Sequence, residues 1–521
     1  MTFTEWFLFF IAIQVIHFAG TWKLYQRAGR KSWEAAVPIY NAIVLLGIIK
    51  RPKWWIILMF FPIVNQLMFP ILWIETARSF GFNQRKDTAL VVLTLGLYIF
   101  YINYATDAAY KADRSLKPRT GLGEWVSSIA FAIIAATMVH TYFMQPYTIP
   151  TSSLEKTLLI GDYLFVSKFH YGARIPMTTI AAPMLHDSLP TAIISGKNSK
   201  SYVKKPQLPY MRVPGFQKIK RNDIVVFSWP VDTLVHWTNP RKGIDYKPID
   251  KKTNYVKRCV GIAGDTLEVR DGYVFINGKQ TVLPDRAKPQ YNFIIDTGGQ
   301  LLDDNNMIKN FGKREGGRLG DGRYYYTLTD KEAEKLRTHS KVKSVTKNLQ
   351  EKGVSENVFP QVASLGWNTD NYGPIYIPKK GATVQLDANS MPFYKRIISE
   401  YENNQLEIIG DNYFINGEKT DSYTFKQDYY WLMGDNRQNS SDARMWGYVP
   451  FDHVVGKPVF IWFSWDANAQ GIGAKIKSIR WDRVFTTVGG DGEPVSYFRY
   501  FLIALALYIG YGFFKKKKKT A

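Results

Sequence analysis

The histidines of this chain lie in no recognisable catalytic motif, and this limits the chemistry open to it. The chain has 7 His, but it contains no G-x-S-x-G nucleophile elbow and no H-E-x-x-H zinc motif. A hydrolase still needs a nucleophile, a base and a place for negative charge. A serine paired with a lysine is one arrangement that fits, because burial lowers the pKa of a lysine until it can act as a base near neutral pH. Lys257, with apolar neighbours Val256, Cys259 and Val260, lies in a predicted strand that could bury it.

Four runs of sequence carry candidate residues for this chemistry. They are IPTSSLEKTLLIGDYLFVSKFHYG at 149–172, RNDIVVFSWP at 221–230, YVKRCVGIAGD at 255–265 and MGDNRQNSSDARMWGYVP at 433–450. In this order they resemble the motifs of bacterial type I signal peptidases, or leader peptidases, which are serine–lysine proteases. The family patterns are P-S-x-S-M-x-P-T-L with a following G-D-x-x-x-V strand, Y-[IV]-K-R-x-[VI]-G-x-P-G-D, and G-D-N-R-x-N-S-x-D-S-R-x-[WF]-G. The resemblance implies a serine endopeptidase that removes N-terminal signal peptides from exported preproteins.

The resemblance also implies a role for each matching residue. Ser153 is the expected nucleophile, Lys257 its general base, and the Thr151 hydroxyl and Ser153 amide the expected oxyanion donors. The residues expected to support the site are Ser440, which would hydrogen-bond the base, and two ion pairs, Asp442 with Arg444 and Arg258 with Asp435. The residues expected to line shallow pockets for the small side chains of an A-x-A-type site are Ile149, Pro150 and Val256.

Some positions depart from the family pattern. Lys156 stands where the family has proline, so the loop loses a fixed φ angle and gains a charge. Thr151 replaces a serine, and its extra methyl group restricts the side chain although the hydroxyl is kept. The other changes are Leu154 for Met, Ala263 for Pro and Ala443 for Ser. None removes a catalytic functional group, so we expect an active enzyme that needs no metal or cofactor.

From about Ile149 the sequence pattern predicts many short strands. Runs rich in Val, Ile, Tyr and Phe are separated by Gly, Pro, Asn and Asp, which is typical of antiparallel sheets. Residues 265–279 predict a hairpin that turns at Asp271-Gly272, and 406–419 are a near copy of it. Thr329 and Glu332 form a capping-box pattern that predicts a short helix. The predicted fold is mostly β, with a signal-peptidase-like catalytic domain and an inserted α+β subdomain.

Apolar runs gather in residues 1–145 and 497–521. A membrane-spanning helix needs about 20 predominantly apolar residues. About five candidates are present, at 6–22, 54–77, 89–105, 125–144 and 497–514. A further apolar stretch at 35–49 contains Pro38 and Asn41, and we interpret it as interfacial or re-entrant.

Basic residues flank these runs and predict their orientation, because Lys and Arg are enriched on the cytoplasmic side. Three basic segments are therefore expected to be cytoplasmic: the loop after the first run, the loop with Lys111, Arg114, Lys117 and Arg119, and the tail Lys515–Lys519. The prediction is a multi-pass protein of the bacterial cytoplasmic membrane. Its N-terminus and residues 145–496 would lie on the extracytoplasmic (periplasmic) side. One loop conflicts, since five crossings place Arg78, Arg85 and Lys86 outside.

The predicted domain organisation follows from these patterns. It comprises an N-terminal membrane region at 1–123, a membrane helix leading into the protease at 124–145, a catalytic core in two parts at 146–284 and 401–480, the inserted subdomain at 285–400, and a C-terminal membrane helix with a basic tail at 497–521.

The charge of +23 and the pI of about 9.6 fit nucleic acid, anionic lipid or the flanks of membrane helices. No zinc spacing or nucleic-acid-binding module is present. The expected partners are therefore preproteins and the lipid bilayer, with no nucleic acid, and the translocation machinery is a further candidate. A single cysteine, Cys259, excludes an intrachain disulfide. Two alternatives remain open: a self-cleaving or regulatory serine–lysine protease, and a catalytically inert membrane assembly protein.

Overall fold

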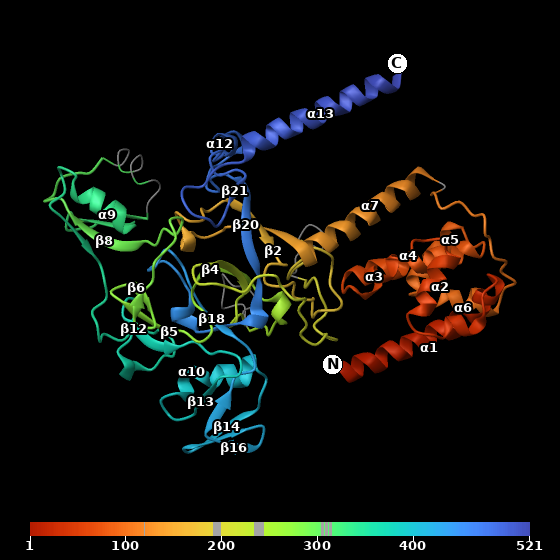
Figure 1. Cartoon of the computed structure of the whole chain (residues 1–521), viewed down its shortest axis with the longest axis horizontal. Helices are drawn as coiled ribbons and strands as arrows, with labels where there is room; N and C mark the ends of the chain where they lie inside the picture. The colour runs from red at the N-terminus through yellow and green to blue at the C-terminus, as the bar shows by residue number, and fades with distance from the viewer. Residues whose placement is uncertain are drawn as a thin grey trace. The chain divides into compact units, whose positions relative to one another are not determined.

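The structure is a computed structural model that describes residues 1–118, 120–190, 199–233, 244–303, 307, 311 and 315–520. Arg119, one of the basic residues predicted to be cytoplasmic, lies outside these residues. The chain forms two compact units (Figure 1). Unit 1 comprises Met1–Met144, Ala173–Val213 and Thr233–Lys252, and unit 2 comprises Gln145–Gly172, Pro214–Asp232 and Thr253–Ala521.

Unit 1 is built mainly from helices. They are α1 (Phe3–Arg27), α2 (Tyr40–Ile48), α3 (Trp55–Phe60), α4 (Val64–Ser79), α5 (Arg85–Leu93), α6 (Tyr98–Tyr104) and α7 (Gly121–Met138), with a 3-10 turn at Ser32–Ala35 and a π turn at Val139–Phe143. Two helices of the described chain, Phe3–Arg27 and Gly121–Phe143 with its π turn, are long and apolar enough to cross a membrane. They correspond to the first and fourth predicted runs.

The second predicted run is not one helix, which corrects the prediction for 54–77. It divides into α3 and α4 at Phe61–Ile63. Pro62 has no amide hydrogen, and Phe61 before it is extended at φ −84° and ψ 116°, as expected for a residue that precedes proline. Ile63 then has a φ of 69°, and the chain reverses. A proline inside an apolar run is the signal that marks this break.

The third predicted run, 89–105, is also broken. Helices α5 and α6 are bent by 116° at the connection between them. Leu95 and Gly96 have φ values of 51° and 87°, and glycine takes such a conformation at little cost. The fifth run lies in α13 (Phe498–Thr520), whose apolar part, Phe498–Gly512, is shorter than a full span. By length and composition, the described chain thus has two candidate spans, or three if α5 and α6 count as one.

The ends of the two broken runs meet at one place in unit 1. The carboxylate of Glu75, near the end of α4, binds Arg51 at 2.9 Å and Arg114 at 2.6 Å. The amide of Lys111 donates to the carbonyl of Ser79 at 2.8 Å. The two ends of residues 52–79 therefore lie close together, near Glu75, and so do the two ends of residues 80–110.

Unit 2 contains the largest sheet of the described chain. Its strand order is β1 (Met144–Thr148), β2 (Asp162–Ser167), β20 (Val454–Ser464), β3 (Ile224–Ser228), β4 (Asn254–Gly261), β18 (Tyr429–Met433) and β19 (Val449–Pro450), and β21 (Thr486–Thr487) pairs with β20. The pairings given by residue register are all antiparallel. The predicted strands at 162–169 and 223–230 correspond to β2 and β3, and the prediction of a mostly antiparallel β fold is confirmed.

Two small sheets confirm the predicted hairpins. In the first, β5 (Thr266–Arg270) and β6 (Tyr273–Ile276) pair across a turn at Asp271 and Gly272, whose φ values are 50° and 82°. Its outer strands are β7 (Lys279–Gln280) and β12 (Tyr372–Tyr376). The near copy forms β14 (Leu406–Ile409), β15 (Asn412–Ile415) and β16 (Glu418–Thr420) in the same antiparallel manner. Strands β13 (Thr383–Gln385) and β17 (Ser422–Thr424) pair beside helix α10 (Met391–Arg396).

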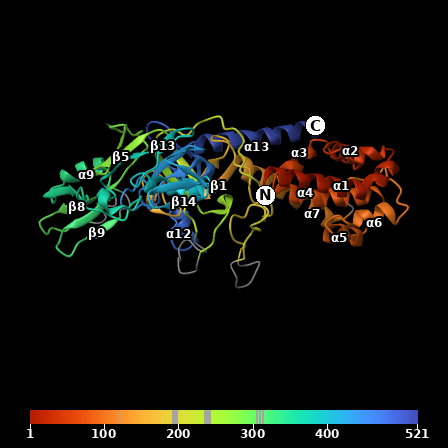
Figure 2. The ribbon, with the colours of Figure 1, turned by 90° about the horizontal axis from the view of Figure 1, so that it is seen from below.

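A separate sheet occupies part of the predicted insertion. Its order is β11 (Ser344–Lys347), β8 (Tyr291–Asp296), β10 (Tyr324–Leu328) and β9 (Gly316–Arg318). Helix α9 (Asp330–Arg337) lies beside β8 in both ribbon views (Figures 1 and 2), and its Ala333 and Leu336 join the apolar core of this sheet. Thr329 and Glu332 form the predicted capping box. We call residues 291–347 the inserted subdomain, because β12 already belongs to the sheet of β5.

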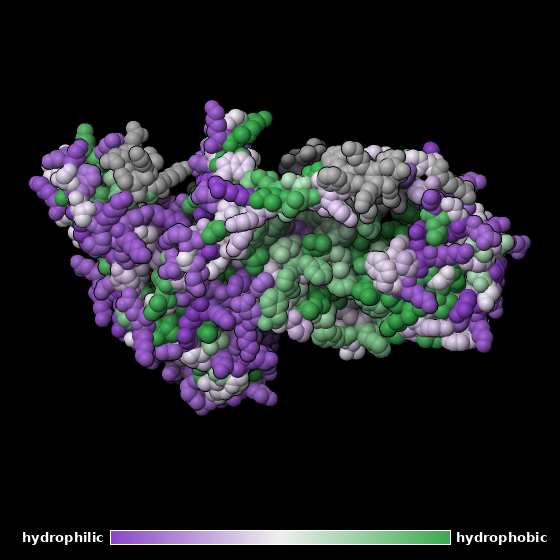
Figure 3. All heavy atoms as spheres, turned by 45° about the horizontal axis from the view of Figure 1, so that its top comes forward, coloured by the Kyte–Doolittle hydropathy of each residue, from purple (hydrophilic) through white to green (hydrophobic). Residues whose placement is uncertain are grey.

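The surface hydropathy differs between the two units. Figure 3 shows hydrophobic colouring gathered over the N-terminal helices and hydrophilic colouring over most of the β-rich unit. Phe7, Trp125 and Phe131 of α1 and α7 are each more than half exposed. Such apolar surface suits contact with lipid rather than water.

Candidate active site

Ser153 and Lys257 meet in the interior of unit 2. Ser153 lies in a 3-10 turn (Ser152–Leu154) shortly after β1, and Lys257 lies in β4. The Lys257 Nζ is 2.7 Å from the Ser153 Oγ, although the two residues are 104 positions apart. Their exposed fractions are only 7% and 5%. A hydroxyl and an amine at this distance can exchange a proton directly.

Burial changes the charge state of Lys257. Loss of water around the ammonium group lowers the pKa of Lys257 from 10.5 to about 8. The carboxylates of Asp442 and Asp435 oppose this effect, and the positive charge of Arg444 adds to it. A useful fraction of the lysine is therefore neutral near physiological pH, and the neutral amine can accept the proton of Ser153.

The predicted pair of Arg258 and Asp435 is present beside Lys257. Arg258 donates to both carboxylate oxygens of Asp435, at 2.7 and 2.6 Å. Burial alone would favour the neutral acid, but the charge and hydrogen bonds of Arg258 outweigh it and hold the pKa of Asp435 below its ordinary value. Thr157, which the sequence did not single out, donates from its hydroxyl to the same carboxylate at 2.6 Å. Asp435 thus connects the strand of Lys257 with the loop after Ser153.

The second predicted pair, Asp442 and Arg444, is equally buried. Arg444 Nε lies 3.0 Å from Asp442 Oδ1, and Nη2 lies 2.9 Å from Oδ2. Asp442 also accepts from the amide of Gly434 at 3.0 Å and caps helix α11 (Ala443–Trp446). Despite its burial, Asp442 is held ionised because Arg444 lowers its pKa. The pair fixes the shape of the segment 434–444, whose charges at Asp435, Asp442 and Arg444 act on Lys257.

Ser440 lies at the site without the bond expected of it. Its hydroxyl is buried and makes no hydrogen bond to Lys257 or to any other residue that the structure describes. Its position is fixed by close packing: a β-carbon built at Gly434 would lie 2.2 Å from Ser440 Oγ and 2.6 Å from the carbonyl oxygen of Ser153. Only glycine fits between these two residues.

The expected oxyanion and substrate residues differ in exposure. Thr151 is exposed, and its hydroxyl makes no hydrogen bond within the described part of the chain. Ile149 is buried in a cluster with Leu154, against which Val256 packs, whereas Pro150 is exposed. Strand β1 ends the strand order of the large sheet, with β2 as its one neighbour among the described strands. Asn254 of β4 donates to the hydroxyl of Tyr147 in β1 at 3.1 Å.

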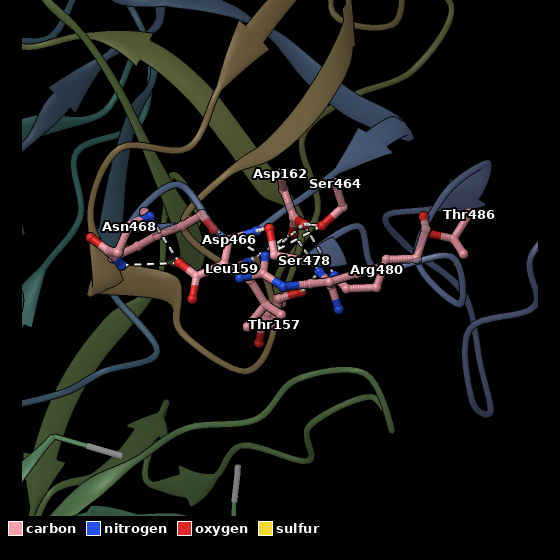
Figure 4. Close-up of polar contacts among 11 residues, drawn as sticks. Thr157, Leu159, Asp162, Ser464, Asp466, Asn468, Ser478, Arg480 and Thr486 are labelled. Atoms are coloured by element: carbon pink, nitrogen blue, oxygen red, sulfur yellow. Dashed lines mark hydrogen bonds and ion pairs between the residues drawn. The ribbon is translucent and has the colours of Figure 1, made fainter. Parts of the chain in front are cut away.

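A buried carboxylate that sequence reasoning missed, Asp162, anchors the end of the segment 154–162 that follows Ser153 (Figure 4). Asp162 accepts from Ser464 at 2.7 Å and from Arg483 Nε at 3.1 Å. Arg480 and Arg483 also donate to the carbonyls of Ile160 and Thr157. The G-D of the serine motif was the only signal for this cluster, since the two arginines lie outside every motif. No group of three or more His, Cys, Asp or Glu able to hold a metal occurs among the described residues.

Comparisons with known proteins match two successive parts of the chain to different families. Residues 33–113 match a family of unknown function, DUF5684. Residues 122–340 and 377–465 match the family described as signal peptidase, peptidase S26. The chain belongs to the signal peptidase S26 family. It is accordingly a serine endopeptidase that acts on signal peptides of exported preproteins, and the family mechanism uses a serine and a lysine.

Curated relatives agree with this membership. Signal peptidase I of Helicobacter pylori (strain ATCC 700392 / 26695) is 24% identical over 379 residues, which is 70% of this chain and 91% of the relative. Signal peptidase I of Rickettsia rickettsii is 23% identical over 379 residues, covering 70% and 93%. That of Buchnera aphidicola subsp. Baizongia pistaciae is 23% identical over 331 residues, covering 63% and 73%. The S26 match begins at residue 122, in α7, so helices α1 to α6 lie before the matched region.

Proposed function

We propose that Ser153 is the nucleophile of this signal peptidase and Lys257 its general base. The observation that carries the proposal is the 2.7 Å contact between Lys257 Nζ and Ser153 Oγ, together with the lowered pKa of the lysine. Ser153 Oγ attacks the scissile carbonyl carbon while its proton passes to neutral Lys257. The C–N bond then breaks as the lysine ammonium protonates the leaving amine. Water, deprotonated by Lys257, hydrolyses the acyl-enzyme ester and releases Ser153.

The proposed oxyanion donors are the Thr151 hydroxyl and the Ser153 amide. Thr151 borders the nucleophile and has no competing partner among the described residues, which leaves its hydroxyl available to a substrate oxygen. A single donor of this kind contributes about 10²–10³ to the rate. Arg258 with Asp435, and Asp442 with Arg444, act as positioning pairs. In this proposal Ser440 is a donor or acceptor for Lys257 that engages only when substrate is bound.

The substrate is proposed to bind as an added strand along the edge of β1 that has no described strand beside it. Main-chain hydrogen bonds along such an edge supply affinity, and side-chain pockets supply specificity. Ile149, Pro150 and Val256 are the proposed pocket residues, and the apolar cluster that Ile149 and Val256 share suits small apolar substrate side chains. An A-x-A-type cleavage site meets this requirement.

We further propose that the enzyme is a multi-pass protein of the bacterial cytoplasmic membrane, with its β-rich unit on the extracytoplasmic side. Helices α1 and α7 are candidate spans, and α13 completes the set if its lysine-rich end serves as the cytoplasmic flank. The meeting of Arg51, Glu75 and Arg114 supports re-entrant hairpins at 52–79 and 80–110 in place of two crossings. The basic residues of 23–117, including Arg78, Arg85 and Lys86, then all lie on the cytoplasmic side, as the enrichment of Lys and Arg there requires.

The test of the function is cleavage of a preprotein that carries an A-x-A site, by purified protein supplied with detergent and lipid. Wild type is expected to cut at that site, whereas Ser153→Ala and Lys257→Ala are expected to be inactive. Activity retained by Lys257→Ala would place the base elsewhere. Self-cleavage without preprotein cleavage would favour a regulatory protease, and an inert folded wild type would favour an assembly role.

A further inference from the structure

The nucleophile loop, residues 152–157, is bordered by the inserted subdomain and by the residue that leads into it. Gln290, just before β8, donates from its side chain to the carbonyl of Glu155 at 2.7 Å. The main-chain amide of Gln290 donates to the main-chain carbonyl of Asp435 at 2.7 Å. The entry to the inserted subdomain is thus bonded both to the nucleophile loop and to the segment around the base.

A second contact pairs Lys156 of the nucleophile loop with Glu332 of α9. The Lys156 ammonium binds the Glu332 carboxylate, and the two side chains are only 15% and 22% exposed. The same carboxylate oxygen accepts from the amide of Thr329 at 2.8 Å as part of the helix cap. The carboxylate is therefore held in place by the helix before Lys156 reaches it, so it can act as a fixed anchor for the loop.

The backbone of Lys156 shows why the loop needs such an anchor. Its φ is 65°, a left-handed conformation that is unfavourable for a residue with a β-carbon. Proline, which stands at this position in the family pattern, is locked near −65° and cannot adopt it. A strained conformation of this kind persists only where its surroundings hold it, and the ion pair with Glu332 is the side-chain contact of Lys156 in the described structure.

A third contact reaches Ser153 itself through Asn436. The amide of Asn436 donates to the carbonyl of Ser153 at 3.1 Å. The Asn436 side chain donates to the carboxylate of Glu315, at the start of β9, at 2.9 Å. Glu315 therefore orients the asparagine that holds the backbone of the nucleophile.

We propose that the inserted subdomain positions the nucleophile, with Lys156 and Glu332 as the principal pair of positioning residues and Glu315 as a second point of support. The inference rests on the proposed roles of Ser153 and Lys257. Neither Lys156 nor Glu332 touches the reacting atoms. Their ion pair fixes the backbone three residues after Ser153 and so keeps Oγ within reach of Lys257. The family's proline stiffens the loop through its own ring, whereas this chain uses a contact made 176 positions away.

The test compares single and exchanged charges in the full-length protein with a preprotein substrate. Glu332→Gln keeps the capping-box geometry, since Gln serves at this position, but removes the charge. Lys156→Glu and Glu332→Lys each place like charges together, and the double variant restores an opposite pair. We expect each charge reversal to lower kcat about tenfold, because misplaced reacting groups slow the chemical step. We expect KM to change little and the double variant to recover most of the kcat that Glu332→Lys alone loses, since both lack the carboxylate that accepts from the Thr329 amide.

Glu334→Gln is the matched control, because Glu334 lies on the same helix, is 67% exposed and pairs only with Arg337 among described residues. It should leave kcat unchanged. The inference is overturned if Glu332→Gln and both reversals keep kcat within about twofold of wild type, or if the double variant is as slow as the single ones. An active wild type with inactive Ser153→Ala, beside unaffected Lys156 and Glu332 variants, would reject this inference alone. An inactive wild type would reject the proposed function instead.

Discussion

The guanidinium of Arg258 donates hydrogen bonds to both carboxylate oxygens of Asp435, at 2.7 and 2.6 Å, in the interior of unit 2. Arg258 follows Lys257 directly on β4, while Asp435 also receives the hydroxyl of Thr157 at 2.6 Å. The buried carboxylate of Asp435 therefore links the strand of Lys257 to the loop that follows Ser153. Removal of this carboxylate should lower both the free energy of unfolding and the rate of cleavage.

We predict that Asp435→Asn lowers the free energy of unfolding by about 3 kcal/mol, because it leaves the charge of Arg258 buried without its partner. Cleavage of a preprotein should fall by a larger factor than the loss of folded protein explains. Chemical unfolding in detergent measures the first effect, and kcat/KM per folded molecule measures the second.

Asp321→Asn provides the control for this prediction. Asp321 pairs with Arg323 at 2.6 Å, but both side chains are about half exposed. Exposed pairs contribute little to stability, so this variant should match wild type in both measurements. If Asp435→Asn and Asp321→Asn have the same stability and activity, burial of the Arg258–Asp435 pair does not stabilise the protein or support cleavage.

The pKa of Lys257 predicts a pH dependence for catalysis. The amine must be neutral to accept the proton of Ser153, and its pKa is lowered to about 8 by burial. The value of kcat/KM, which reports groups of the free enzyme, should rise with pH and reach half of its upper level near pH 8. A profile that is flat between pH 6 and 9 would contradict the assignment of Lys257 as the base.

The same lowered pKa predicts that stability, like activity, rises with pH, because the folded protein disfavours the charged form of Lys257. An unfolded chain keeps the ordinary lysine pKa of 10.5, so between pH 8 and 10.5 the unfolded state binds more protons and stability rises with pH. Below pH 8 the folded state bears the full cost of the buried charge. Lys257→Met should therefore abolish cleavage yet raise the free energy of unfolding at pH 7, by at most about 3 kcal/mol for 2.5 pKa units. Unfolding of both proteins in urea at pH 7 and pH 10 would measure it, with the gain shrinking at pH 10.

Gly434 offers a steric prediction at the same site. A β-carbon there would meet Ser440 Oγ at 2.2 Å and the Ser153 carbonyl oxygen at 2.6 Å. Gly434→Ala must therefore displace the nucleophile or Ser440, and we expect kcat to fall by about 10² or more. Gly473→Ala is the matched control, since its β-carbon would meet nothing within 4 Å. A fully active Gly434→Ala enzyme would show that the close packing around Ser440 is not needed.

Sequence reasoning succeeded where local chemistry decides the structure. The Asp271-Gly272 turn, the Thr329–Glu332 cap and the strands around Lys257 follow from residue types at short range. The residues of the motifs converge because the strands that carry them pair in one sheet, a pairing that the sequence did not specify. Contacts between distant residues with no motif, such as Lys156 with Glu332 and Asp162 with Arg483, were not predictable in this way. Composition also failed to separate an apolar run that crosses a membrane from one that turns back at Pro62 or Gly96.

That last failure yields a prediction about topology. Five crossings would put Lys86 outside the cell, whereas the re-entrant hairpins put it on the cytoplasmic side, because the segments on both sides of it end beside Glu75. Cys259 is fully buried, so Cys259→Ala supplies a cysteine-free background. In that background Lys86→Cys should react with a membrane-impermeant maleimide only after the cytoplasmic membrane of spheroplasts is opened.

Two reference positions calibrate the labelling. Lys31→Cys is cytoplasmic under either arrangement and should behave as Lys86→Cys does. Val282→Cys, at a position 88% exposed in the β-rich unit, should react in intact spheroplasts. Reaction of Lys86→Cys in intact spheroplasts, at the rate of Val282→Cys, would restore the five crossings. Protection of Lys86→Cys instead leaves every basic flank of the N-terminal helices on the cytoplasmic side, which removes the conflict that the five-crossing arrangement creates at Arg78, Arg85 and Lys86.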